Sequence, residues 1–393
     1  MARSDRSGRW LTALMALGIA SILVSARPAP ALADPGTSPW GSPTVVAAGL
    51  PDAAWPSLVF TRDGRKHAVW ETEGRIYYAT QAPEQEWSSP SIIARGITPV
   101  LVADDGGHLH TLFVNQFMTN YEIYDITLDD GVWSLPVNVS HTSGFSAFPA
   151  ATAGIAGTLY VAWMDNSPGY WTIYLGIWNG KYWSNQPVPN ARGQAPTLAQ
   201  SPDGTLFLAW QDRVPSVSNP TGTFHIFLSE RSNATWSLPV DVSDRPQVES
   251  IGASLTTTPD GLAQLAWIDD GREVRYCLGQ GSYWPSPVTV SRAATLARGP
   301  KILAEKGLRI HIAWDEADRV RATSAAPGAL NWPKPVVITA PTADLRDVVL
   351  TLGPVNGVSV DWVQTSQPQD VAIYESWRKS DFIDRAWLPT ISR

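Results

Sequence analysis

One stretch, SPDGTLFLAWQD (Ser201 to Asp212), returns in altered form about every fifty residues and limits the possible folds more than any other feature. Each copy reads as a tight turn, an alternating strand that ends in Trp, and a polar residue two positions later. Close copies are TRDGRKHAVWET (Thr61 to Thr72), TPDGLAQLAWID (Thr258 to Asp269) and KGLRIHIAWDE (Lys306 to Glu316). Such a period is typical of repeat architectures, in which each unit buries its apolar face against its neighbours.

Three aromatic positions recur along the repeats, two of them in all seven units and the third in six. The strand after the turn ends in one aromatic column, which consists of Trp70, Phe113, Trp163, Trp210, Trp267, Trp314 and Trp362. A third strand carries Ile-Tyr-like pairs at 76–77, 123–124, 173–174, 226–227, 275–276 and 373–374. A fourth strand begins with a Trp that Pro follows within four residues, at Trp87, Trp133, Trp183, Trp236, Trp284, Trp332 and Trp387.

The fourth strand predicts the architecture. Proline cannot donate to a strand ladder, so its recurrence places this strand on the outer edge of a sheet. Aromatic columns suit sheets that radiate from an axis, because the gap between them widens outward and large side chains fill it. We therefore expect an all-β chain that forms a seven-bladed β-propeller of four-stranded antiparallel blades. Six or eight blades are the alternatives.

An extra copy of the outer strand stands at the start of the ring. The segment WGSPTVV (Trp40 to Val46) has no blade of its own, so we expect this N-terminal strand to pair into the last blade and close the ring. Alternatively, the tail at 379–393 forms that outer strand and the Trp40 segment lies beyond it.

Residues 1–33 have the three parts of a secretory signal. Arg3, Arg6 and Arg9 precede an apolar run from Trp10 to Val24, and the small-x-small site Ala31-Leu32-Ala33 precedes Asp34. Fifteen apolar residues are fewer than the roughly twenty that span a bilayer. We expect cleavage, export to an extracytoplasmic location, and a mature chain, 34–393, that is one propeller domain without a transmembrane segment.

The net charge limits the kinds of partner, and the cysteine count limits how the fold is held together. Residues 34–393 hold 25 basic and 35 acidic residues, a net charge of −10, which argues against nucleic acid. Cys277 is the only cysteine, so no internal disulfide can form and the core must hold the fold. We expect a monomer without a metal or cofactor. His67, His110 and His311 share one column and are interpreted as packing residues.

The turn between the third and fourth strands carries a family resemblance. SERSNATW (Ser229 to Trp236) resembles the Asp-box pattern Ser-x-Asp-x-Gly-x-Thr-Trp in Ser229, Thr235 and Trp236, with Arg231 and Asn233 at the Asp and Gly places. Over residues 40–393 the chain thus resembles the sialidase-like, or BNR-type, repeat propellers with degenerate motifs.

That resemblance implies three arginines around a substrate carboxylate, a Tyr nucleophile assisted by Glu, and an Asp acid. The family's Arg-Ile-Pro signature has no counterpart here. Tyr374-Glu375 resembles a nucleophile pair, but Tyr374 shares a column with Tyr77, Tyr124, Tyr174 and Tyr276, which favours packing.

Two polar columns go beyond packing. Two residues after the second-strand aromatic stand Thr72, Asn115, Asp165, Asp212, Asp269, Glu316 and Gln364. Arginine recurs in the blade-to-blade connections as Arg95, Arg192 and Arg298, with Arg245 and Arg346 nearby. In an up-and-down blade both positions emerge on the same side, so both columns should ring one mouth of the channel.

Two interpretations of these columns stay open. The arginines could pair with acids of neighbouring blades and staple the ring. Alternatively, Arg95, Arg192 and Arg298 bind an anionic ligand while Asp165, Asp212 and Asp269 accept bonds from sugar hydroxyls.

A glycoside hydrolase needs a unique acid and a nucleophile or base, and the candidate residues here all stand at positions that recur from repeat to repeat. We therefore predict a non-catalytic binding module for glycans or cell-surface partners, with a divergent sialidase-like hydrolase and a protein-interaction scaffold as alternatives.

Overall fold

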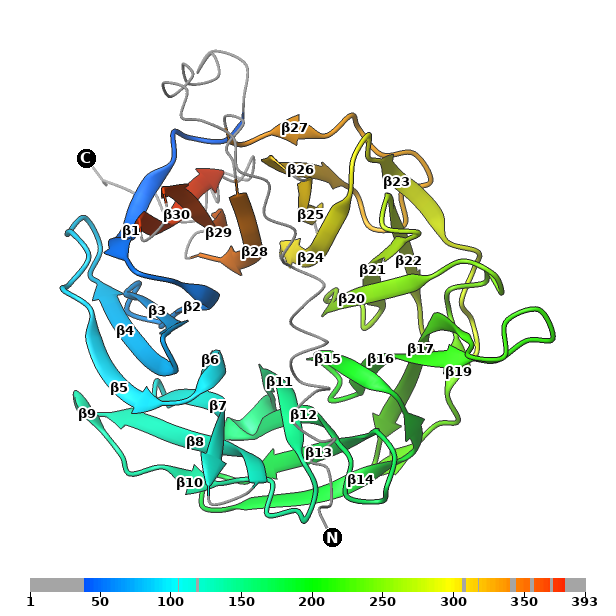
Figure 1. The fold of residues 1–393 in the computed structure, drawn as a ribbon, viewed down its shortest axis with the longest axis horizontal. Helices are drawn as coiled ribbons and strands as arrows, with labels where there is room; N and C mark the ends of the chain where they lie inside the picture. The colour runs from blue at the N-terminus through cyan, green and yellow to red at the C-terminus, as the bar shows by residue number, and fades with distance from the viewer. Residues whose placement is uncertain are drawn as a thin grey trace, which may run out of the picture. The chain divides into compact units, whose positions relative to one another are not determined.

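The computed structural model describes residues 39–378, apart from 105, 118, 119, 306–308, 317, 340–343, 354–356, 368 and 369. The expected signal sequence, the tail at 379–393 and Trp387 lie outside the described residues. All described strands belong to one compact unit, residues 32–393. In it seven antiparallel sheets radiate from a common axis (Figure 1), so the predicted seven-bladed propeller is confirmed.

The innermost strand of each blade lies nearest the axis (Figure 1). In blade order these strands are β2 (Ala54–Phe60), β6 (Ile97–Ala103), β11 (Ser146–Ala153), β15 (Gln194–Gln200), β20 (Ser250–Thr257), β24 (Ala297–Glu305) and β28 (Asp344–Leu352). The second strands are β3 (Lys66–Thr72), β7 (Leu109–Phe117), β12 (Leu159–Asp165), β16 (Leu206–Val214), β21 (Ala263–Asp269), β25 (Arg309–Glu316) and β29 (Val358–Gln367).

The third strands are β4 (Arg75–Gln81), β8 (Asn120–Asp129), β13 (Thr172–Trp178), β17 (Thr223–Ser232), β22 (Glu273–Gly279), β26 (Arg319–Ala325) and β30 (Asp370–Arg378). The outer strands are β5 (Ser91–Arg95), β9 (Val132–Trp133) with β10 (Val137–Asn138), β14 (Trp183–Arg192), β18 (Thr235–Trp236) with β19 (Val240–Asp241), β23 (Val288–Arg292), β27 (Val336–Val337) and β1 (Thr44–Leu50).

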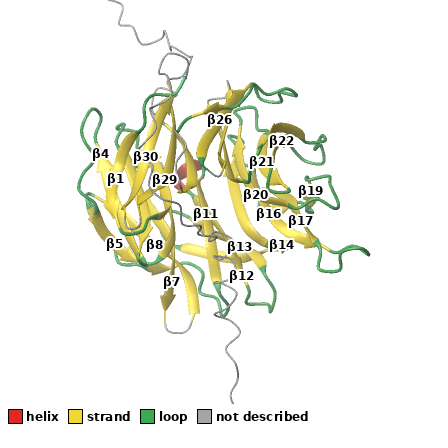
Figure 2. Ribbon diagram, turned by 45° about the horizontal axis from the view of Figure 1, so that its top comes forward, coloured by secondary structure: helices red, strands yellow, loops and turns green. Residues whose placement is uncertain are grey.

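Strand makes up most of the described chain (Figure 2), which also contains a 3-10 turn, η2 (Ile155–Gly157). Two outer strands are split at a proline. Pro136 separates β9 from β10, and Pro239 separates β18 from β19, because a residue without an N–H interrupts the ladder. No helix among the described residues is long and apolar enough to cross a membrane.

Strand β1 completes the last blade. It pairs antiparallel with β30, with Val45 opposite Tyr374, and Trp40 forms a further bridge to Arg378. The predicted closure by the N-terminal strand is therefore confirmed. Because β1 lies directly against β30, the alternative in which the C-terminal tail comes between them is wrong.

The core consists of seven apolar clusters, and each lies between two neighbouring blades. The second-strand aromatic of every blade is buried and packs against the preceding blade. Trp210, for example, lies in the same cluster as Ala162 and Met164 of the preceding blade. This packing explains the first aromatic column, since removing one ring would open a cavity between two blades.

Most third-strand tyrosines stack on these aromatics. Trp362 and Tyr374 have ring centroids 5.8 Å apart and an interplanar angle of 12°. Placing Tyr276 in the tyrosine column is wrong, because Arg275 is the residue opposite Trp267. The sheet register, which the sequence spacing did not show, puts Tyr276 one position further along the strand, where it packs in the cluster of the next blade.

Candidate functional site

We call the two sides of the ring the connection face and the turn face. The connection face carries the loops between second and third strands and the connections from each blade to the next. The turn face carries the turns between first and second strands and between third and fourth strands. Asp165, Asp269, Arg95 and Arg192 end their strands on the connection face, while Asp212 and Arg298 lie within two residues of such an end. The two predicted columns thus lie on one face.

Two of the predicted acids are internal acceptors. Asp165 is fully buried and accepts bonds from the hydroxyls of Thr142 at 2.7 Å and Ser146 at 2.8 Å, and from the amide of Ser167 at 2.8 Å. Asp269 is also fully buried, and it accepts hydrogen bonds from the hydroxyl of Ser250 and from the indole of Trp267. These carboxylates hold the start of the first strand against the end of the second.

Asp212 is different because it is only half buried. Its Oδ1 accepts the amide of Arg213 at 2.8 Å. Burial raises the pKa of Asp212, and the amide of Arg213 and the charge of Arg192 act against that rise. The guanidinium of Arg192 lies 4.3 Å from the ring centroid of Tyr170, which holds this exposed cation in place.

The arginines divide into paired and unpaired groups. Arg245 contacts Asp269 at 3.2 Å and Glu273 at 2.9 Å, and Arg346 contacts Asp52 at 2.8 Å across the junction of the last and first blades. These two arginines act as the staples that one interpretation predicted. Arg95, Arg192 and Arg298 are exposed and form no ion pair with any residue between 39 and 378 that the structure describes.

In the fifth blade, Arg275 stands where most other blades have a tyrosine stacked on the second-strand aromatic. Arg275 is buried, lies 3.4 Å from Asp269 and donates to the carbonyl of Pro287 at 2.8 Å. Arg245 and Arg292 approach the same carboxylates, and their hydrogen bonds lower the pKa of Glu273. The three arginines therefore converge on protein carboxylates, Asp269 and Glu273.

Tyr374 and Glu375 are also occupied by the fold. Tyr374 stacks on Trp362, and Glu375 is buried with Lys66 at 2.9 Å and the indole of Trp377 at 2.8 Å. Both side chains join strands and blades.

The predicted histidine column also consists of bonded interior groups. His67 Nδ1 lies 2.8 Å from the hydroxyl of Tyr78, and His110 Nδ1 lies 2.8 Å from Asp125 Oδ2. His311 is fully buried and bridges Glu305 and Ser324.

A feature that sequence reasoning missed surrounds the axis on the connection face. Every innermost strand has a register shift near its start, and every shift contains one residue with positive φ. We call these seven residues the bulge ring: Trp55, Thr98, Phe148, Ala195, Gly252, Gly299 and Asp347. A bulge of this kind bends a strand and redirects its side chains. Proline follows the bulge residue in five blades, and that repeated x-Pro was the available signal.

The bulge ring is not uniform. Trp55 is 41% exposed, and its ring meets that of Phe148 edge-on with centroids 6.1 Å apart, so residues of the first and third blades touch. The amide of Trp55 donates to Asp347 Oδ2 at 3.0 Å. On the fourth to sixth blades the ring residues are Ala195, Gly252 and Gly299, and a Cβ at Gly299 would meet nothing within 4 Å.

Acidic and basic groups gather where the sixth blade meets the last. Asp315 is 3% exposed, and Arg298 lies directly opposite it on the neighbouring strand. Burial raises the pKa of Asp315 to about 7, against the charge of Arg298, while Asp347 and Asp344 add to the rise. Lys301 and Asp347 also interact electrostatically. Neither Asp315 nor Asp347 belongs to a predicted column.

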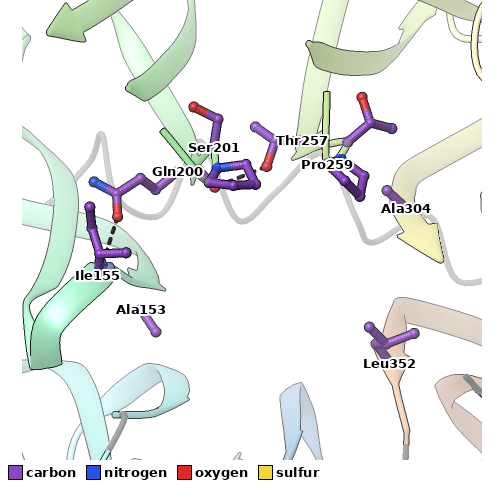
Figure 3. A pocket seen from close by; sticks show the side chains of 11 residues that line it. Ala153, Ile155, Gln200, Ser201, Thr257, Pro259, Ala304 and Leu352 are labelled. Atoms are coloured by element: carbon purple, nitrogen blue, oxygen red, sulfur yellow. Dashed lines mark hydrogen bonds between the residues drawn. The ribbon is translucent and has the colours of Figure 1, made fainter. Parts of the chain in front are cut away.

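Two cavities lie on the turn face. One, of about 350 Å³, lies where innermost strands end, and Figure 3 shows Gln200, Ser201, Thr257 and Leu352 among its uncharged lining. Gln200 Oε1 there accepts the amide of Ile155 at 2.9 Å. The other, of about 410 Å³, lies between the first and second blades and includes Arg65 and His67. Neither cavity contains any of the six predicted site residues.

Comparison with known proteins supports the fold. No protein-family model and no curated protein matches the chain. An ulvan lyase of polysaccharide lyase family PL25, bound to -[GlcA(1-4)Rha3S]-, is similar with a TM-score of 0.62 and 11% identity, over 85% of this chain and 96% of that one. A Dyadobacter fermentans protein of unknown function has a TM-score of 0.54 and 15% identity, over 86% of this chain and 97% of that one.

An intramolecular trans-sialidase from Ruminococcus gnavus matches with a TM-score of 0.47 and 10% identity, over 85% of this chain and 96% of that one. That score is too low to support an argument. The first two likenesses show a common propeller fold, and the relationship to BNR repeats stays a prediction.

Proposed function

We propose that the connection face binds an acidic saccharide and that the protein acts as a binding module. The single observation that carries this proposal is the contrast between arginines on that face. Arg245 and Arg346 are paired with carboxylates, whereas Arg95, Arg192 and Arg298 are exposed and form no ion pair among the described residues. A guanidinium without a protein partner is well suited to a carboxylate or sulfate, which it can bind through two parallel hydrogen bonds.

The residues of the bulge ring favour a sugar as the ligand. Trp55 presents an exposed indole beside the axis, and an aromatic face of this kind packs well against the apolar face of a pyranose. Across the ring, Ala195, Gly252 and Gly299 carry little or no side chain and leave room for a chain to pass. Asp212 is half buried near Arg192 and can accept a bond from a sugar hydroxyl.

The expected signal sequence at 1–33 fits this proposal. Export would bring the protein to extracellular polysaccharides, and this part rests on the sequence alone.

The test compares anionic and neutral polysaccharides by titration calorimetry. Ulvan oligosaccharides and dextran sulfate should bind, and uncharged dextran should not. The double variant Arg192→Ala/Arg298→Ala should weaken binding at least about tenfold, because each charge-assisted contact contributes on the order of 1.5–3 kcal/mol. Arg65→Ala removes a partly exposed cation, paired with Asp63, from the turn face and should leave the affinity unchanged. Equal affinities in the wild type and the double variant, with both folded, would refute the proposal.

A further inference from the structure

Asp315 occupies a position that is apolar in most blades. The equivalent residues, one after the second-strand aromatic, are Glu71, Val114, Met164, Gln211, Ile268 and Val363. They face the next blade, as Met164 does in the cluster around Trp210. Gln211 is hydrogen-bonded there, since its Oε1 accepts the backbone amide of the bulge-ring residue Gly252 at 3.0 Å. Asp315 has no such bond, and its buried Oδ1 has no hydrogen-bond partner among the described residues.

Arg298 is placed to respond to this acid. Directly opposite residues of an antiparallel pair project from the same face, with Cβ atoms about 5 Å apart. Arg298 and Asp315 are such a pair, yet they form no ion pair within the described structure and Arg298 remains exposed. The other ionisable groups that act on Asp315 are Asp344 and Asp347 of β28, and across its own hairpin it faces Val320.

We propose that Asp315 controls whether Arg298 is available to an anionic saccharide, so that the connection face binds the ligand in mildly acidic solution and releases it as the solution becomes alkaline. This rests on the proposed function and adds regulation to the same site. Protonated Asp315 is neutral and leaves Arg298 to the ligand. Ionised Asp315 attracts Arg298 and repels the anion. Since burial raises the pKa of Asp315 to about 7, the change falls near neutrality.

The experiment measures the affinity for dextran sulfate, whose charge is constant, at pH 6 and at pH 8.5. Wild-type affinity should fall about five- to tenfold, the effect of one added charge within about 8 Å in a partly screened site. Asp315→Asn has nearly the same shape without the titration, and it should bind at both pH values as the wild type does at pH 6.

We call the control of Arg298 by Asp315 the gate. Two further variants separate the effect of this gate from the effects of other titrating groups. Arg298→Gln should bind weakly at both pH values, because the group that Asp315 controls is gone. Asp361 is another fully buried acid, and its cross-strand partner Glu375 contacts Lys66 near the turn face. The Asp361→Asn variant should therefore keep the wild-type pH dependence of the affinity for dextran sulfate.

The outcomes separate a failure of this gate from a failure of the proposed binding function. No wild-type binding at pH 6 would overturn the proposed function and the gate together. Wild-type binding that is unchanged at pH 8.5, or an Asp315→Asn variant that keeps the full pH dependence, would overturn the gate and leave the binding site standing.

Discussion

At the scale of single residues, buried carboxylates differ in how the fold uses them. Asp165 has several donors, whereas among the described residues Asp361 accepts bonds from two hydroxyls, those of Ser359 at 3.0 Å and Thr351 at 3.3 Å. Asp361 also lies opposite Glu375 on the neighbouring strand. Burial raises the pKa of Asp361 to about 8, and the charge of Glu375 adds to the rise. Asp361 is therefore protonated in the folded protein near neutral pH.

This acid should make stability depend on pH. Its folded pKa lies above the unfolded value, so its contribution is complete below about pH 4 and is lost as pH rises towards 8. We expect the free energy of unfolding of the wild type to fall, relative to Asp361→Asn, by up to about 1.4 kcal/mol per pH unit in that range. Urea titrations from pH 4 to 9 measure the difference, and parallel curves for the two proteins would contradict it.

The sequence could name acids near the connection face but not their environments. Asp165 and Asp212 occupy the same repeat position, yet one is buried and the other half exposed. The difference arises because Thr142, on the connection into the third blade, and Ser146, at the start of β11, both donate to Asp165. Asp315 escaped notice for a similar reason, since its importance depends on Arg298 and Asp347, which come from other strands.

At the scale of elements, the bulge in each innermost strand is the feature that most affects the site. Five of its seven positive-φ residues are not glycine, which is uncommon for residues as bulky as Trp55 and Phe148. Pattern-based reasoning found the strands because alternation and turns are local signals. It missed the bulges because strand pairing imposes their backbone conformation, and the one local signal, a following proline, is present in five of the seven blades.

The bulge conformation predicts opposite effects for two substitutions. Ala195→Gly relieves a positive φ of 52° and should raise the free energy of unfolding by about 0.5–1 kcal/mol. Gly299→Ala places a Cβ in open space but at a φ of 49°, so it should lower that energy by about 1 kcal/mol. Denaturant midpoints of both variants test this, and a stabilising Gly299→Ala would show that the strain is absent.

At the scale of the whole molecule, closure depends on the N-terminal strand. Val46 and Ala47 of β1 pack in the cluster between the last and first blades, while Trp40 packs in the cluster between the sixth and last. The surplus Trp-x-x-Pro copy was enough to predict this pairing. The segment 40–50 contributes to two blade interfaces, so it should open only when the ring itself opens.

Hydrogen exchange tests that expectation. Amides of Val45 and Ala47 should exchange about as slowly as those of the central strands. Val132 and Trp133, in a two-residue outer strand, provide a fast-exchanging comparison. Rapid exchange throughout residues 41–47 would mean that β1 does not close the ring in solution.

A crystal structure of the protein with a bound ulvan oligosaccharide would show whether the connection face holds an acidic saccharide. We expect a carboxylate or sulfate against Arg192 or Arg298 and a sugar ring on Trp55. An oligosaccharide seated in a turn-face cavity, with Arg192 and Arg298 paired to protein carboxylates, would contradict it.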